Sequence, residues 1–176
     1  MNEEKGLVIL YTGEGKGKTT AALGLVLRAV GYKKKCLIVQ FGKVWFTGEL
    51  VGIKNLPGVK IIQGGKGFLG ILGSKISKED HKKAAKEAFD IIYKEVMSGK
   101  WDIVVADEIV GAVSSGILPI ESCVKLIQDK PIWLDLILTG HHASKKLIDM
   151  ADLVTEMKEI KHPFQKGILA KKGIDF

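Results

Sequence analysis

The sequence predicts an α/β fold, with a mostly parallel twisted sheet, helices on both faces and three layers. Two observations support this. Short apolar runs typical of buried strands alternate along the chain with longer segments of helical periodicity, as in sheets whose parallel strands are joined by crossover helices. The chain has 176 residues, enough to bury a sizeable core. We therefore predict a single nucleotide-binding α/β domain over residues 1–176.

The first strand is predicted at residues 7–11 and the first helix at 18–30, ending at Gly31. Between them lies Gly-Glu-Gly-Lys-Gly-Lys-Thr-Thr, residues 13–20. Strand, glycine-rich loop and helix in this order are typical of a phosphate-binding P-loop, in which backbone N–H groups surround an anion. This order predicts a P-loop NTPase architecture of the RecA-like type. The alternative is a glycine-rich turn that binds no ligand.

The loop is one residue shorter than the common P-loop motif. Three residues separate Gly13 from the Gly17-Lys18 pair, whereas the common motif has four. We expect Lys18 to reach the terminal phosphates and the Thr19 hydroxyl to bind a phosphate-bound Mg²⁺.

The remaining elements follow in the same alternating order. Strands are predicted at 36–41, 59–62, 101–106, 134–139 and 154–160, and helices at 77–99, 119–129 and 144–149. A capping-box-like start at Ser77 opens the longest helix. Residues 42–57 and 64–73 lack periodicity, which indicates binding loops.

Asp107 and Glu108 end a predicted buried strand. In a P-loop fold an acidic residue at this place meets the Mg²⁺, and a carboxylate at the end of a buried strand needs a cation or donors nearby. We therefore predict a metal site of Thr19, Asp107 and Glu108. The alternative is a pair of residues that only caps the next helix.

The net charge is +7, and Arg28 is the only arginine. Proteins that read nucleic acid rely on arginine and aromatic platforms, so we expect no nucleic-acid partner and interpret the scattered lysines as solvated surface charge. No apolar run reaches membrane-spanning length, and no signal peptide is recognisable. We expect a cytoplasmic protein that binds no membrane, with Cys36 and Cys123 as buried apolar side chains.

The whole chain resembles the P-loop corrinoid adenosyltransferases, also called cob(I)alamin adenosyltransferases. The resemblance lies in the short P-loop of residues 12–20 and in strings that follow in the family order. These strings are Arg28–Gly31, Val39–Phe41 with Lys43, Gly48-Glu49, Asp107-Glu108, Thr139-Gly140, Ala151-Asp152, Thr155-Glu156, Lys161–Pro163 and Gly173–Phe176. The short P-loop and the last two strings are the most specific of them.

The resemblance implies transfer of the 5′-deoxyadenosyl group of ATP to the Co(I) of a reduced corrinoid, cobalamin or a precursor, with release of triphosphate. It implies Mg²⁺ bound with ATP, a homodimer and a transient flavoprotein reductase. It implies catalytic roles for Lys18, Thr19, Glu108 and Phe68. The residues expected to bind ATP or the corrinoid are Gly13, Glu14, Gly15, Lys16, Gly17, Lys18, Thr19, Thr20, Arg28, Gln40, Lys43, Glu49 and His162.

The sequence departs from the family pattern at two places. Gly70 stands where familiar members hold a tryptophan, and His141 stands where the Thr-Gly string usually continues with arginine. Two other functions therefore stay open at this point. One is a RecA-like P-loop ATPase or phosphotransferase, and the other is a module that binds ATP or a corrinoid without turnover.

Overall fold

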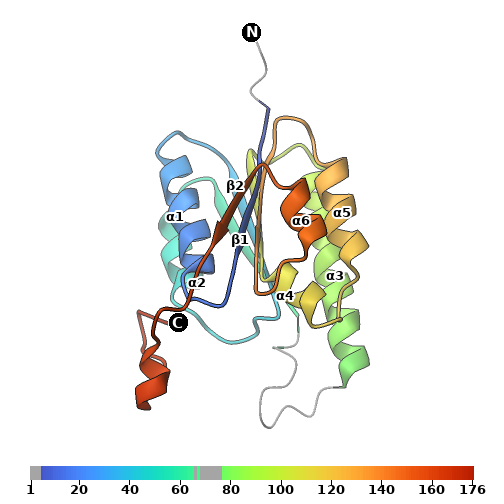
Figure 1. Cartoon of the computed structure of the whole chain (residues 1–176). Helices are drawn as coiled ribbons and strands as arrows, with labels where there is room; N and C mark the ends of the chain where they lie inside the picture. The colour runs from blue at the N-terminus through green and yellow to red at the C-terminus, as the bar shows by residue number, and fades with distance from the viewer. Residues whose placement is uncertain (1–4, 66, 68–76) are drawn as a thin grey trace.

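The computed structural model describes residues 5–65, 67 and 77–176, and it contains one six-stranded sheet of order β3-β2-β4-β5-β1-β6 (Figure 1). The strands are β1 Val8–Thr12, β2 Cys36–Phe41, β3 Val59–Gly64, β4 Ile103–Asp107, β5 Asp135–Thr139 and β6 Leu153–Glu156. Every neighbouring pair is parallel. The predicted α/β class is confirmed, and the sheet is wholly rather than mostly parallel.

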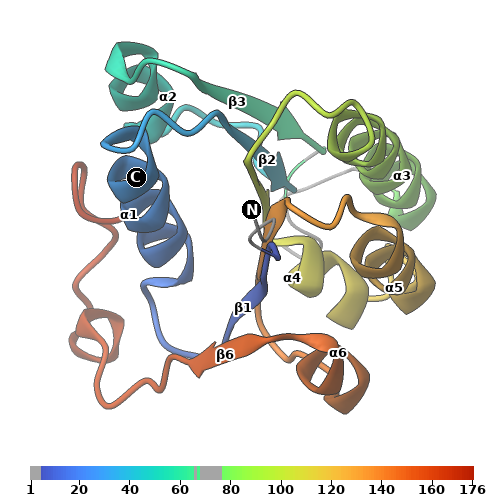
Figure 2. The same cartoon turned by 90° about the horizontal axis from the view of Figure 1, so that it is seen from above.

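Helices cover both faces of this sheet. The predicted helices are present as α1 Lys18–Val30, α3 Lys78–Val96, α5 Ile120–Asp129 and α6 Lys145–Met150. The structure adds α2 Glu49–Gly52, α4 Ile109–Ser114 and two 3₁₀ turns, η1 Ile53–Asn55 and η2 Pro163–Lys166. Figure 2 shows α1 on one face of the sheet and α3 to α6 on the other, which gives the predicted three layers.

The core consists of two apolar clusters, one on each face. Residues of β2 alternate between them: Ile38 packs with Val26 of α1, whereas Leu37 and Val39 pack with Ile92 of α3. This alternation follows from the two-residue period of a strand. All residues of β2 are buried, as expected for a central strand covered on both faces.

The predicted end of the last strand is wrong. The last strand stops at Glu156 rather than at residue 160, because Met157 bonds to the end of β1 and to the loop between β1 and α1. Its N–H donates to Thr12 O (2.8 Å), and its carbonyl accepts from Gly15 N–H (2.7 Å). The predicted end of α1 is confirmed, since the helix stops at Val30 with Gly31 as its C-cap; Gly31 keeps a right-handed conformation, and Lys33 is the left-handed residue, with φ of 60°.

Parallel strands all end at the same edge of a sheet, where open α/β folds bind their ligands. The loops after β1, β2, β4 and β5 therefore lie together at the lower edge in Figure 1. In the described part of the chain, no helix combines the length and apolar character that crossing a membrane requires.

Candidate functional site

The phosphate loop between β1 and α1 is closed tightly. A Cβ on Gly13 would lie 2.4 Å from Met157 O, and one on Gly15 would lie 2.8 Å from the same atom. Gly13 and Gly17 also have φ of 98° and 109°, in the region that glycine adopts without strain. Glycine is therefore needed in this loop for two reasons. The backbone after β6 leaves no room for a Cβ on Gly13 or Gly15, and Gly13 and Gly17 have positive φ.

Lys18 points back into this loop. Its Nζ donates to Gly13 O (2.7 Å) and to Gly15 O (2.8 Å), and the residue is 4% exposed. Burial lowers the pKa of Lys18, and the negative charges of Glu108, Glu14 and Asp107 partly offset that effect. The ammonium is thus held beside the loop amides, where it can meet an anionic ligand.

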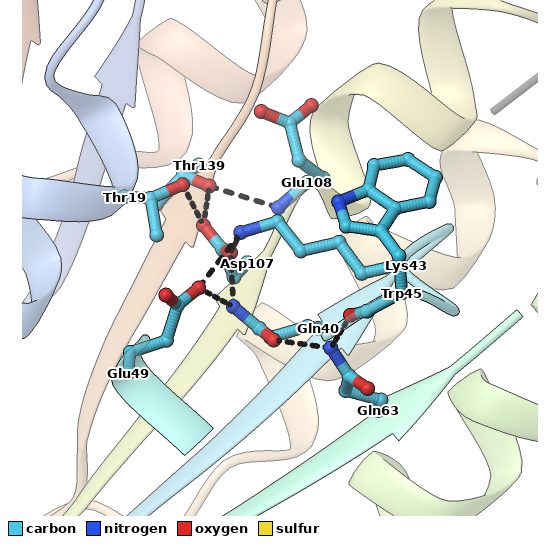
Figure 3. Close-up of polar contacts among 9 residues, drawn as sticks. All are labelled: Thr19, Gln40, Lys43, Trp45, Glu49, Gln63, Asp107, Glu108 and Thr139. Atoms are coloured by element: carbon cyan, nitrogen blue, oxygen red, sulfur yellow. Dashed lines mark hydrogen bonds and ion pairs between the residues drawn. The ribbon is translucent and has the colours of Figure 1, made fainter. Parts of the chain in front are cut away.

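Asp107, at the end of β4, is fully buried and is the centre of a polar cluster (Figure 3). Its Oδ1 accepts from the Thr19 and Thr139 hydroxyls, both at 2.8 Å. Its Oδ2 accepts from Gln40 Nε2 and from Lys43 Nζ, both at 3.2 Å. Four donors stabilise the buried carboxylate, so Asp107 fixes side chains from α1, from β2 and the loop after it, and from the end of β5.

Glu49, at the start of α2, extends the cluster. Its Oε1 accepts from Gln40 Nε2 (3.1 Å) and Lys43 Nζ (3.4 Å). Burial by itself would raise the pKa of Glu49, but hydrogen bonds from Gln40, from its own backbone N–H and from Thr47, together with the Lys43 charge, outweigh it, so this pKa is lowered. Gln63, at the end of β3, donates to Gln40 Oε1 (3.2 Å) and holds the amide in this orientation.

Glu108 is the neighbour of Asp107 but lies apart from this cluster. Its side chain points away from the other residues in Figure 3, because its backbone is left-handed, with φ of 64°. Its backbone N–H donates to the Thr139 hydroxyl (2.8 Å), which links Glu108 to the cluster through the main chain. Burial, and next the charge of Asp107, raise the pKa of Glu108. The two predicted metal-binding carboxylates therefore have different environments.

Two cavities meet at Glu108 and His141. The larger, about 600 Å³, is bordered by the phosphate loop, the loop after β2 and the end of the chain. Lys16, Lys18 and Lys43 all line it, together with Thr19 and Glu49. The smaller, about 330 Å³, is mainly apolar and is lined by residues such as Phe41, Ala85, Ala112 and Ile117. A charged cavity thus adjoins an apolar one.

The loop after β5 approaches the phosphate loop. Glu14 lies 3.2 Å from Nδ1 of His142 and 3.6 Å from Nδ1 of His141. Burial, followed by the charge of Lys18, lowers the pKa of His141. On the other side of the loop, Lys16 forms an ion pair with Asp175. The loop is therefore contacted by side chains from two distant parts of the chain.

Most of the predicted binding residues come together here. Gly13 to Thr20, Gln40, Lys43, Glu49, Asp107 and Glu108 all lie at the lower edge of the sheet. Within the described residues, the lining of the larger cavity includes neither Arg28 nor His162. Arg28 lies in the last turn of α1, and the Nδ1 of His162 accepts from Phe164 N–H (3.2 Å) in the exposed tail. Phe68 and Gly70 fall outside the described residues.

The sequence analysis missed several site residues. Thr139 and Gln63 end β5 and β3 and support Asp107 and Gln40. Their signal was a polar residue at the carboxyl end of an apolar strand. Gly173 to Phe176 of the tail, which border the larger cavity, were named only as a string of the family resemblance. Their place in the site was not predicted, because nothing local shows that a tail returns to the first loop.

No group of three or more histidine, cysteine or acidic residues among the described residues could hold a metal ion by itself. The oxygens that fit Mg²⁺ are the Thr19 hydroxyl and the Asp107 carboxylate behind it. This set suits Mg²⁺, which usually takes one or two protein oxygens and completes its shell with substrate phosphates and water.

Comparisons with known proteins agree with this geometry. A family model described as ATP:corrinoid adenosyltransferase BtuR/CobO/CobP matches residues 4–176. The corrinoid adenosyltransferase of Escherichia coli strain K12 is 33% identical over 175 residues, which is 99% of this chain and 87% of that protein. That of Sinorhizobium sp. is 36% identical over 181 residues, covering 99% of this chain and 82% of that protein.

A solved structure supports the fold alone. A KaiC-like protein from the hyperthermophilic archaeon Pyrococcus horikoshii superposes with a TM-score of 0.58 at 17% sequence identity, over 89% of this chain and 75% of the other. The predicted RecA-like architecture is thereby confirmed. The full-length family match also decides between the functions that the sequence analysis left open, in favour of adenosyl transfer. The chain belongs to the ATP:corrinoid adenosyltransferase family, whose members transfer the adenosyl group of ATP to a corrinoid.

Proposed function

We propose that the larger cavity binds MgATP with its triphosphate on the loop Gly13–Thr20, and that a reduced corrinoid attacks the ribose. The Co(I) donates its electron pair to C5′, the new Co–C bond forms, and the C5′–O bond breaks. The bonding electrons leave with triphosphate. The single observation that carries this proposal is the convergence of Lys16, Lys18 and Lys43 on one cavity.

These three ammonium groups match the charge of the leaving group. A displacement at C5′ needs no protein nucleophile or general base, only positioning of the reactants and stabilisation of the charge that develops on the phosphates. Lys18 already lies beside the loop amides. Lys43 is held by Asp107 and Glu49. The site therefore supplies fixed positive charge where the triphosphate would depart.

Mg²⁺ would be held by Thr19, and Asp107 would act through the Thr19 hydroxyl that it binds. When bound, the ion neutralises phosphate charge and orients the triphosphate. Because all four hydrogen bonds to Asp107 are already made, its main task is to orient Thr19 and Lys43. The side chain of Glu108 lies outside this cluster and lines both cavities where they meet.

The corrinoid would lie against the apolar cavity beside Glu108 and His141. This places an apolar surface next to the nucleotide, and excluding water protects a strongly reducing metal centre from side reactions. Phe68 remains a proposed shield, and Arg28 and His162 remain proposed binding residues that would act from outside the larger cavity.

We also propose a homodimer, supplied with electrons by a flavoprotein reductase in the cytoplasm, with no nucleic-acid or membrane partner. The edge strand β6 supports a second copy, because all its residues are exposed, with Leu153 and Val154 on opposite sides. The unpaired backbone groups of an edge strand can pair with another chain.

Product identification tests the proposed reaction. The protein is incubated without oxygen with chemically reduced cobalamin and MgATP, and the phosphorus products are separated by anion chromatography. We expect a light-sensitive adenosylated corrinoid and triphosphate in equal amounts. Release of phosphate or diphosphate in place of triphosphate, at the rate of corrinoid adenosylation, would overturn the mechanism.

A further inference from the structure

The end of the chain returns to the phosphate loop. After β6 the tail runs through exposed residues and η2, and its end lies beneath α1 (Figure 1), a placement that the view from above also shows (Figure 2). We call residues 171–176 the C-terminal strap. Gly173, Ile174, Asp175 and Phe176 all line the larger cavity. The strap is therefore part of the proposed nucleotide site although it is far from the loop in sequence.

The strap is a compact turn. The Asp175 carboxylate accepts from Lys171 N–H (2.7 Å), and the N–H of Asp175 donates to Lys171 O (2.8 Å). The N–H of Gly173 donates to Phe176 O (2.7 Å). These bonds fix the carboxylate within the strap, so that it reaches the loop as a preformed anionic group.

This carboxylate pairs with the loop. Asp175 Oδ1 contacts the Lys16 ammonium, and the aspartate side chain is 14% exposed whereas that of Lys16 is 52% exposed. Lys16 is one of the three lysines that line the larger cavity. Asp175 thus places a negative charge at the edge of the cavity that we propose for a more highly charged anion.

We infer that the C-terminal strap is an autoinhibitory contact, in which Asp175 occupies Lys16 until the triphosphate of ATP displaces it. This inference rests on the proposed function of the loop. A lysine that pairs with Asp175 must exchange partners to bind phosphate, and a carboxylate left beside the phosphates repels them. ATP binding therefore releases the strap, and strap release opens the side of the cavity lined by Ile174 and Phe176.

Asp175→Asn tests the inference by calorimetric titration with MgATP, without corrinoid. The amide keeps an oxygen for Lys171 N–H but removes the charge. We expect MgATP to bind about two- to fivefold tighter, which is the range of an exposed ion pair. Asp149→Asn is the matched control, because Asp149 pairs with Lys145 on the surface of α6, and it should bind as the wild type does.

A double-mutant cycle with Lys16→Gln sharpens the test. If Asp175 acts through Lys16, Asp175→Asn should give no further gain in that background. Unchanged binding by Asp175→Asn would overturn the inference, and so would weaker binding, since it would mean that Asp175 positions Lys16 for the phosphates. Lys18→Met keeps the two proposals distinguishable: if it also binds normally, the loop itself is not the triphosphate site.

Hydrogen exchange on the wild-type protein gives a second readout that needs no variant. The N–H groups of Gly173 and Asp175 are hydrogen-bonded within the strap and should exchange slowly without ligand. On saturation with MgATP we expect their exchange to become at least several times faster. Equal or slower exchange would show that the strap stays closed over the nucleotide and would overturn the inference.

Discussion

Replacement of Lys18 by methionine is the most direct test of the phosphate loop. Methionine keeps most of the length and apolar character of the lysine stem and removes the ammonium group. The Nζ now donates to the carbonyls of Gly13 and Gly15 and is almost completely buried. The substitution therefore has two separable effects, one on MgATP binding and one on the stability of the loop.

The size of each effect follows from the contacts. Hydrogen bonds to charged groups contribute about 1.5–3 kcal/mol, so the loss of the ammonium should weaken MgATP binding about 10- to 150-fold. Two loop carbonyls lose their donor, which costs about 1–3 kcal/mol. Relief from burying a charge, which lowers the pKa of Lys18, offsets part of that cost. For a chain of this size we expect a fall in Tm of about 2–8 °C.

The assay is calorimetric titration with MgATP at one fixed salt concentration, together with thermal unfolding followed by circular dichroism. Lys82→Met is the matched control, because Lys82 on α3 is far from the loop, its side chain is 44% exposed and its ion pair within the described residues is with Glu79, at 2.8 Å. If Lys18→Met is folded and its Kd lies within twofold of the wild-type value, the loop does not hold the triphosphate and the reasoning is wrong.

Three further predictions concern stability. Thr139→Val removes a donor to Asp107 and the acceptor of Glu108 N–H, so it should cost about 1–3 kcal/mol of the free energy of unfolding in urea; no change would show that these bonds are not needed. Gly24→Ala, where nothing lies within 4 Å of the added Cβ, should raise Tm by about 1–4 °C. Gly140→Ala should instead lower Tm well below the wild-type value, because the added Cβ would lie 2.3 Å from Gly111 N. A similar Tm for the two glycine variants would contradict this packing. Glu108→Gln tests the raised pKa of Glu108. The folded wild type binds this proton more tightly than the unfolded chain, so its stability falls as pH rises above the ordinary value of 4.5. The variant should therefore gain stability relative to wild type between pH 4.5 and 8, with no such gain at pH 3.5; urea unfolding that shows equal pH dependence for both would refute it.

The parts of the fold that could be predicted depend on local patterns. The alternation of apolar strands and helices predicted the α/β class, and the N-cap at Ser77 was correct, since its hydroxyl accepts from Asp80 N–H (3.1 Å). Helix α4 was missed because its start, at Glu108, is a left-handed residue without a side-chain cap. Only Asp107 and Glu108 separate its apolar residues from those of β4, and six residues are too few to show a helical period.

The site was predictable as a list of residues but not as an arrangement. Asp107 and Glu108 are adjacent in sequence and looked equivalent as metal ligands. The sheet order makes them different, because β5 lies next to β4 and brings Thr139 to one side of Asp107. The left-handed turn at Glu108 then directs the second carboxylate to the boundary of the two cavities. The Asp107 carboxylate, with four donors, orients its neighbours. Burial raises the pKa of Glu108, so this second carboxyl group can meet an apolar ligand at less electrostatic cost than a fully ionised one. The division of work that we propose between a nucleotide side and a corrinoid side therefore depends on strand order and one backbone angle, neither of which the residue types alone determine.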